Sequence, residues 1–309
     1  MFVALYAGHF KSVQADIKPD FSLNYSLGSV FQNLGGGSSQ DVDLEPSDSS
    51  PDQKQPEIEK EVVQGFSANW STDYPLSTSG GSGIGSQGAR AVSPTVQLSL
   101  KYNPLSYWFG QISFYKYLFS ERQQSWNPDF TYSFGYDDWH TDTFSMVYSN
   151  YGGNRFRRDP ANGGKHTVFN QGQWSFGYKF MLPQSLEQLF LVGDGDQTGC
   201  NANLGITPSF TDSETLLVKS YKKTISIGCR YTRPSGWYAN ITVLTYLGNS
   251  QQPWDPDFTY GFGYSDSSPG GITVQYSNYS ANRFPGHNAL PGDGSLRKGG
   301  ISISWSPPW

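Results

Sequence analysis

Strict alternation of side chains with a period of two residues is the feature that most constrains this chain. In residues 129–136 every second side chain is aromatic, and the side chains between them are small or polar. Because successive side chains of a strand point to opposite faces, this segment predicts a strand with one aromatic face and one small, polar face. The aromatic residues are Phe130, Tyr132, Phe134 and Tyr136.

The same pattern returns later in the chain as an internal repeat. Residues 126–156 match residues 254–284 position by position, which is a constant offset of 128. The match continues upstream, where 95–118 resembles 224–247, and downstream, where 172–180 corresponds to 298–305. Such self-similarity predicts one structural unit used twice. We therefore expect two tandem repeats of six strands each, residues 63–183 and 198–309.

Twelve alternating segments are separated by turn signals, and the links between them are alternately short and long, with the exception of 183–200, which falls on the short side and joins the two repeats. We expect an all-β fold, a single antiparallel barrel of twelve strands built from the two six-strand repeats. The expected strands are 63–74, 94–104, 106–118, 129–137, 143–152, 172–182, 201–210, 223–232, 237–247, 257–265, 271–281 and 299–306.

Composition excludes several other classes. Charged residues make up only 15% of the chain while aromatic residues make up 16%, which does not suit a helical bundle or coiled coil. The net charge of −5 does not suggest the basic surface that a nucleic-acid-binding protein needs. No run of apolar residues is long enough for a transmembrane helix. Cys200 and Cys229 are too few for a disulfide-stapled scaffold; they form either one disulfide or two unrelated thiols.

The last segment carries a resemblance to a known class. Ile301, Ile303 and Trp305 alternate with serines, and the chain ends on Trp309. Over residues 63–309 the sequence resembles bacterial outer-membrane β-barrels, although the prolines at 307–308 depart from their usual ending. The resemblance implies a transmembrane barrel in the bacterial outer membrane, in contact with membrane lipids and lipopolysaccharide. A soluble carbohydrate-binding β protein, such as a tandem sandwich, is the competing interpretation.

The N-terminal part differs in composition from the rest. Residues 1–15 are a short apolar run followed by small residues, which fits either a signal-peptide remnant or an unstructured start. Residues 16–62 carry a net negative charge and are rich in Ser and Pro, which predicts a disordered segment that could contact a periplasmic partner.

The sequence offers little for catalysis or metal binding. The chain has four histidines, and no His-x-Ser pair of the kind that a barrel lipase would need occurs. The most similar motif is the repeated Tyr-Ser-Asn at 148–150 and 276–278, in which a tyrosine precedes the serine. Tyrosine is a poor general base near neutral pH, because its pKa is about 10. We expect no enzyme, no metal site and no cofactor.

Two sets of residues are candidates for function. The first set lies on the polar faces of strands and would line a pore, where charge tunes selectivity and tyrosine can stack on sugars. Its members are Lys101, Tyr115, Tyr117, Lys179, Arg230, Tyr238 and Tyr246. The second set is repeated where strands meet long loops, and its arginines either attract anions at a pore mouth or pair with the aspartates as a structural clamp. Its members are Asp129, Asn154, Arg155, Asp257, Asn282 and Arg283.

The function expected from these features is passive passage of small polar solutes, including saccharides, through the barrel. A basic, aromatic lumen of this kind is similar to that of twelve-stranded oligosaccharide channels. The alternatives are a barrel component of an envelope or exopolysaccharide export assembly, a lipid-modifying barrel enzyme and the soluble carbohydrate-binding protein.

Overall fold

The computed structural model describes twelve strands that follow one another around a single closed barrel. The residues described are 65–76, 93–119, 128–138, 140–150, 154–156, 169–188, 193, 195–211, 217–252, 255–266, 268, 270–278, 282–287 and 295–307. The strands are β1 (Gly65–Pro75), β2 (Thr95–Leu105), β3 (Trp108–Tyr117), β4 (Phe130–Asp137), β5 (Phe144–Asn150), β6 (Gln173–Met181), β7 (Gln197–Thr211), β8 (Val218–Thr232), β9 (Trp237–Leu247), β10 (Phe258–Ser265), β11 (Ile272–Asn278) and β12 (Gly300–Trp305). The expected segments 1–15 and 16–62 lie outside the described residues.

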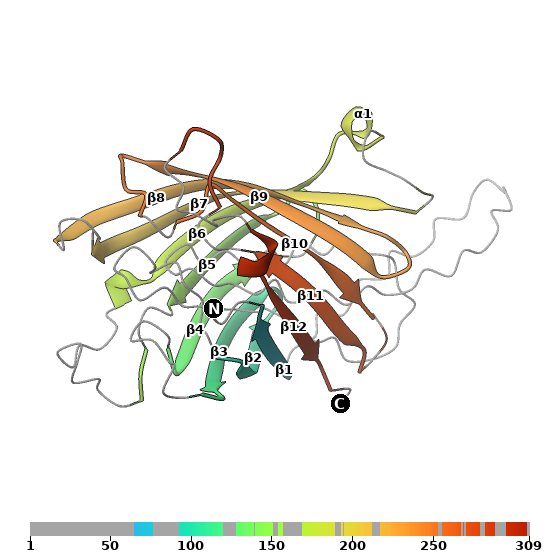
Figure 1. Cartoon of the computed structure of the whole chain (residues 1–309), viewed down its shortest axis with the longest axis horizontal. Coiled ribbons are helices and arrows are strands. Elements are labelled where there is room, and N and C mark those ends of the chain that lie inside the picture. Colours follow the sequence, from blue (N-terminus) through green and yellow to red (C-terminus); the bar gives the residue numbers. More distant parts are fainter. Residues whose placement is uncertain are drawn as a thin grey trace, which may run out of the picture.

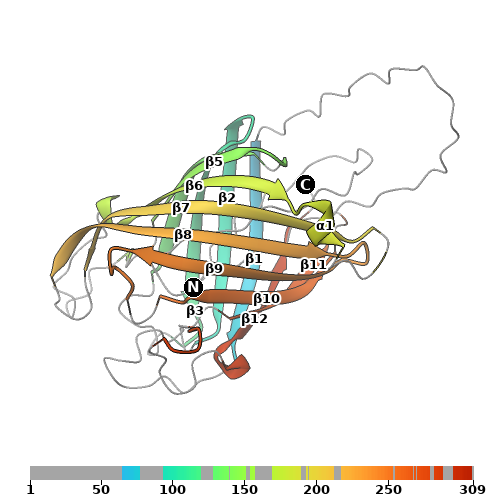
Figure 2. The ribbon, with the colours of Figure 1, turned by 90° about the horizontal axis from the view of Figure 1, so that it is seen from above.

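Every strand pairs antiparallel with its neighbours in the chain, and the first strand pairs with the last. The closing pair β1–β12 runs from Trp70 opposite Trp305 to Pro75 opposite Gly300. Figure 1 shows the strands wrapped around one interior, and in Figure 2 β6–β10 cross the view over β1–β3, which run at a steep angle behind them. Closure leaves no sheet edge among the twelve strands. The predicted all-β barrel of twelve antiparallel strands is confirmed.

Two strands are longer than the sequence pattern predicts. The seventh was expected to begin at residue 201 and the eighth at residue 223, but β7 begins at Gln197 and β8 at Val218. At the far end of this pair, Thr207–Thr211 and Val218–Lys222 pair with each other while β6 and β9 have already ended. These residues mix polar, charged and apolar side chains without a regular alternation, so the pattern underestimates the hairpin they form.

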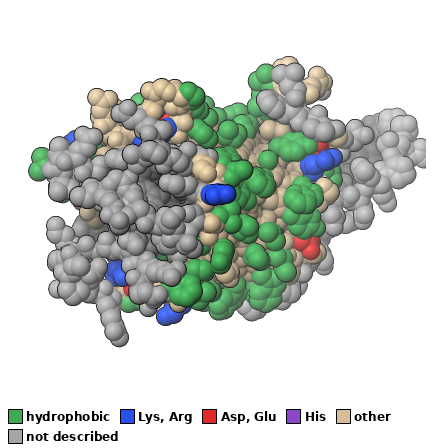
Figure 3. All heavy atoms as spheres, viewed as in Figure 1, with side chains coloured by type: hydrophobic (Ala, Val, Ile, Leu, Met, Phe, Trp, Pro, Cys, Tyr) green, Lys and Arg blue, Asp and Glu red, His purple; other side chains and the backbone are tan. Residues whose placement is uncertain are grey.

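The faces of the barrel have inverted polarity. The small and polar side chains of the strands point inward and are buried, for example Thr131, Ser133 and Ser226. The large apolar side chains point outward and are exposed, for example Phe262 and Ile227. Figure 3 shows hydrophobic side chains covering the middle of the described surface. The aromatic face predicted for 129–136 is therefore the outer face.

The two ends of the barrel differ in the connections they carry. One end, which we call the short-turn end, holds the links after β2, β4, β6, β8 and β10; the opposite end is the long-loop end. The β2–β3 turn is tight, and Tyr107 within it adopts a positive φ of 62°. Trp108, Trp174, Trp237 and Trp305 lie at or next to strand ends, and Trp70 lies within β1.

A buried tyrosine fastens β5 to β6 at the long-loop end. Tyr148 lies against the backbone of Gly172, and its hydroxyl donates to the carbonyl of Phe169 at 2.6 Å. Tyr276 on β11 makes the equivalent contacts with Gly299 and with the carbonyl of Leu296, at 2.8 Å. The carbonyls belong to two short 3-10 helices, Phe169–Gln171 and Leu296–Lys298, which the alternation pattern does not predict.

A disulfide joins the neighbouring strands β7 and β8. Cys200 and Cys229 are directly opposite in the antiparallel register, with 4.1 Å between their Cα atoms, and they are bonded. The question left open by the sequence is answered in favour of the disulfide. Cys200 was expected at the edge of a strand, but because β7 begins at Gln197 it lies within the paired region.

The only α-helix in the described part of the chain is α1 (Gln184–Glu187), which follows β6. None of the helices described has the length and apolar character needed to cross a membrane.

Candidate functional site

All seven predicted pore-lining residues lie on the inward face of the barrel. Tyr115 and Tyr117 on β3, Lys179 on β6, Arg230 on β8 and Tyr238 on β9 are buried. The remaining two, Lys101 on β2 and Tyr246 on β9, are partly buried on the same face. Their position follows from the strand register, because each one alternates with an outward apolar neighbour. Their role in a pore stays a prediction.

Three of these residues are cations at the short-turn end, and each meets a different partner. Lys179 donates to a carboxylate oxygen of Asp137 at 2.7 Å and to the carbonyl of Asp138 at 2.6 Å. The Arg230 guanidinium stacks on the Tyr238 ring, 3.8 Å from its centroid. The Lys101 ammonium lies over the Phe109 ring at 4.9 Å. Aromatic faces attract cations electrostatically, so the rings hold these two charges inside the barrel.

At the long-loop end the first set of predicted rim residues forms a clasp between β4 and the segment after β5. Asp129 accepts a hydrogen bond from the Phe156 amide at 2.9 Å, and its carboxylate lies 3.6 Å from the Arg155 guanidinium. The Asp129 amide donates to the carbonyl of Asn154 at 2.6 Å. The Phe156 ring stacks on Phe130 at 5.4 Å. We call these contacts the first rim clasp.

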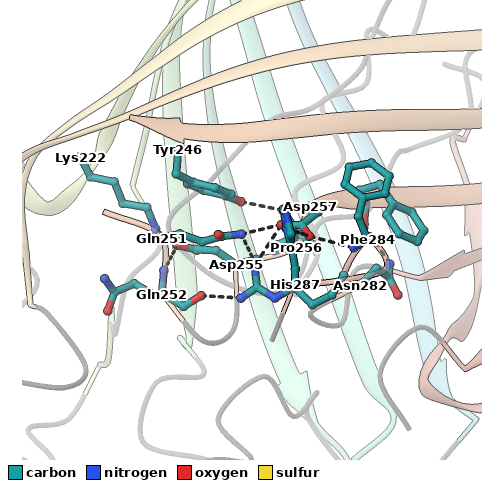
Figure 4. Close-up of polar contacts among 12 residues, drawn as sticks. Lys222, Tyr246, Gln251, Gln252, Asp255, Pro256, Asp257, Asn282, Phe284 and His287 are labelled. Atoms are coloured by element: carbon teal, nitrogen blue, oxygen red, sulfur yellow. Dashed lines mark hydrogen bonds and ion pairs between the residues drawn. The ribbon is translucent and has the colours of Figure 1, made fainter. Parts of the chain in front are cut away.

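The second set makes the same contacts 128 positions later, and we call it the second rim clasp (Figure 4). Asp257 accepts from the Phe284 amide at 2.9 Å and from the Arg283 guanidinium at 3.1 Å. Its own amide donates to the carbonyl of Asn282 at 2.7 Å. Of the two interpretations of the repeated arginines, the structure shows the ion pairs that a structural clamp requires.

Two predicted pore-lining tyrosines take part in the clasps. The Tyr117 hydroxyl donates to the carbonyl of Pro128 at 3.1 Å, and the Tyr246 hydroxyl donates to the carbonyl of Pro256 at 3.0 Å. Each tyrosine therefore holds the residue immediately before the clasp aspartate. These hydroxyls are committed to the rim, so stacking on a solute would have to use the ring faces.

The second clasp has contacts for which the described part of the first shows no counterpart. Asp257 also accepts from Gln251 at 2.7 Å and lies 2.6 Å from Nδ1 of His287. Close by, the buried Lys222 ammonium forms an ion pair with Asp255. At the positions equivalent to Lys222 and Asp255 the first repeat has Ser93 and Asn127, so this ion pair is specific to the second half.

The electrostatics of the second clasp favour an ionised Asp257. Burial by itself would raise the pKa of Asp257, but the hydrogen bonds from Phe284, Gln251, His287 and Arg283 outweigh it and lower that pKa. Asp255 behaves oppositely, because burial raises its pKa more than the Lys222 ammonium lowers it. Asp257 is thus the charged centre of the clasp at neutral pH.

The two described histidines each place Nδ1 against an aspartate at 2.6 Å, His140 on Asp138 at the short-turn end and His287 on Asp257 at the long-loop end. Ser149 and Ser277 are buried on the inward face. Among the residues that the structure describes, no group of three or more His, Cys, Asp and Glu side chains could hold a metal ion.

Sequence reasoning placed Tyr117 and Tyr246 in the lumen but missed their contacts with the clasps, although both halves repeat these tyrosines together with the Asn/Asp-Pro-Asp segment that they contact. It also missed Lys222, Gln251 and His287 of the second clasp, because no pattern in the sequence separates them from their neighbours. The pairing of β8 with β9, in which Lys223 lies opposite Leu247, brings Lys222 and Asp255 together across 33 positions of sequence.

No protein-family model and no curated protein matches this chain. Among solved structures, the chain is similar to OmpF of Salmonella typhi, whose structure is a complex with daunomycin. The match covers 79% of this chain and 97% of that chain at 10% identity, with a TM-score of 0.35. We base no argument on a similarity of that size.

Proposed function

We propose that this chain is a transmembrane barrel of the bacterial outer membrane that lets small polar solutes pass through its interior. The observation that carries the proposal is the inverted polarity of a closed barrel, with large apolar side chains outside and Ser, Thr, Asn and Gln inside. In a soluble barrel the apolar faces would pack against each other in the core. An outward apolar band and a polar interior are the pattern that lipid on one side and water on the other require.

Three further features support the proposal. Closure satisfies every strand edge, which a membrane demands because lipid offers no hydrogen-bond partners. The Cys200–Cys229 disulfide suits an oxidising compartment such as the periplasm. The two matching rim clasps fit an origin from two tandem six-strand repeats, and a symmetric pair of halves suits a pore better than a single catalytic centre.

Lipopolysaccharide is the lipid partner that this proposal implies. Lys116 on β3 and Lys223 on β8 are exposed, point outward and lie near the long-loop ends of their strands. Ammonium groups at that level would meet lipid phosphates if the long loops face outside the cell.

A substitution on the outer face separates the membrane barrel from a soluble one. Ile227 lies in the middle of the barrel part of β8 and is 53% exposed. In a soluble protein Ile227→Arg would be nearly neutral, whereas at the centre of a bilayer it should lower the free energy of unfolding by about 2–4 kcal/mol. Val218→Arg is the matched control, because Val218 belongs to the β7–β8 extension, where the effect should be about 0–1 kcal/mol. Equal, small effects of both changes on urea unfolding in lipid vesicles would contradict membrane placement.

Conductance then tests passage through the barrel. The full chain, inserted into planar bilayers, should give discrete conductance steps, and proteoliposomes should swell in isotonic solutions of a small neutral sugar. A barrel that inserts and resists unfolding but conducts nothing would refute the channel and leave the structural barrel of an envelope assembly.

A further inference from the structure

The inward face at the short-turn end carries an excess of positive charge. Lys101, Lys179 and Arg230 point into the barrel there, from β2, β6 and β8. On the inward faces of the described strands at this end, Asp137 is the one carboxylate. The three cations come from strands spread around the barrel, so a solute that passes this level meets positive charge from more than one side.

The carboxylates at this end already have other partners. Asp137 pairs with Lys179 at 2.7 Å, and Asp138 contacts Nδ1 of His140 at 2.6 Å. Asp196, in the link before β7, accepts from the amide of Gly193 at 2.8 Å and lies 3.5 Å from the Arg233 side chain. The described carboxylates at this end are therefore already engaged by Lys179, by His140, and by the Gly193 amide and Arg233.

Lys101 is the cation whose charge is least compensated. Its ammonium lies over the Phe109 ring, a contact that attracts it without neutralising it, and no described carboxylate lies within ion-pair distance of it. The charged groups that act on it most are Asp137, which is shared with Lys179, and Lys179 itself. Both Lys101 and Phe109 come from the β2–β3 hairpin, whose tight turn fixes their relative position.

We propose that Lys101, together with Lys179 and Arg230, forms an anion site inside the barrel and makes the channel select small organic anions over cations. This inference rests on the proposed function. A carboxylate or sulfate on a solute would take the acceptor position that Lys101 leaves open, and the Phe109 and Tyr238 rings would provide apolar faces beside the charge. Small acidic sugars, such as uronic acids, combine a carboxylate with a sugar ring that can pack on an aromatic side chain.

The test is ion selectivity in planar bilayers, measured as the reversal potential across a KCl gradient. The natural chain should pass chloride more readily than potassium. Lys101→Gln should lower the chloride-to-potassium permeability ratio about two- to fivefold, the effect of one charge on passing ions at about 8 Å in screened water. Lys101→Arg should keep the natural ratio. Lys116→Gln, which removes the same group from the outward face of the adjacent strand, is the matched control and should leave the ratio unchanged.

A second measurement uses solutes of equal size. Glucuronate should cross proteoliposomes of the natural chain faster than glucose, and Lys101→Gln should remove that difference. If Lys101→Gln fails to fold, as judged by loss of heat-modifiable migration on a gel, Arg230→Gln tests the same site. A conducting barrel that prefers potassium, or whose preference survives both substitutions, would overturn the inference. A folded barrel that does not conduct would instead refute the proposed function.

Discussion

Adding a single methyl group at Gly172 should unfasten β5 from β6. A Cβ at this position would lie 2.8 Å from Cε2 of Tyr148 and would overlap Cζ and the hydroxyl still more. Gly172 does not have a positive φ, so an alanine there meets no backbone strain. The whole effect of Gly172→Ala therefore comes from its collision with one ring.

The ring has nowhere to move. Tyr148 is fully buried, stacked on Phe169 at 4.2 Å and packed against Phe134 and Trp174 at 5.0 and 5.3 Å. Carbon atoms pack at about 3.5–4.0 Å, so the ring must shift by roughly 1 Å. Overpacking of this kind costs about 1–3 kcal/mol. The shift also breaks the 2.6 Å hydrogen bond to the Phe169 carbonyl, worth about 0.5–1.5 kcal/mol. We expect a total loss of about 2–4 kcal/mol.

A double-mutant cycle isolates this collision. The free energy of unfolding would be measured by urea titration of the barrel in lipid vesicles, followed by tryptophan fluorescence, for Gly172→Ala, Tyr148→Ala and the double variant. With the ring removed, Gly172→Ala should have an effect below about 0.5 kcal/mol. Gly110→Ala is the control, because a Cβ at Gly110 meets nothing within 4 Å. Additive effects of the two substitutions would refute the reasoning, since they would place the damage somewhere other than the Tyr148 ring.

Four other outcomes are expected. Gly299→Ala should couple to Tyr276→Ala in the same way in the second half, again read from the urea cycle. Asp257→Asn should lower the temperature of heat-modified migration more than Asp266→Asn does, because Asp257 is buried and accepts from Gln251 and Arg283, whereas Asp266 is an exposed turn residue; equal effects would contradict the role of the clasp bonds. Because the pKa of Asp257 is lowered on folding, its stabilisation is present above the unfolded value of about 3.9 and is lost as pH falls below it, so the natural chain should lose stability between pH 5 and pH 3 more steeply than Asp257→Asn. The Cys200–Cys229 disulfide closes a loop across a separation of 29, so Cys200→Ser with Cys229→Ser should lower the free energy of unfolding by about 3–4 kcal/mol, and a reductant should do the same only to the natural chain.

The local pattern of the chain was enough to identify the strands and their faces. In β4 the period of two residues determines which side chains lie opposite each other, whatever the strand packs against. The alternation of short and long links then predicts antiparallel neighbours, and the even number of strands allows the first and last to meet. For these reasons the strands, their order and their two faces could be predicted. The inward position of Lys101 followed once the polar face was interpreted as the face that lines the lumen.

The rim was predictable only where the chain repeats itself. Asp129 with Arg155, and Asp257 with Arg283, stand out because the same residues recur at one offset, and both pairs form. The ion pair of Lys222 with Asp255 and the contact of His287 with Asp257 occur once each and join distant segments. A contact of that kind depends on how far β8 extends beyond its neighbours and on where a loop returns to the rim.

The side chains that each strand presents to its two faces follow from the local chain, because the direction of a side chain in a strand is a property of the local backbone. Which face becomes the interior depends on how the twelve strands close. Closure of twelve strands, through β1 and β12, places the small and polar faces in the interior, together with tyrosines such as Tyr115 and Tyr238, and leaves the large apolar faces outside. The disulfide and the clasps depend on the register between consecutive strands, and the positive charge at the short-turn end depends on closure, which brings inward side chains of β2, β6 and β8 into one interior.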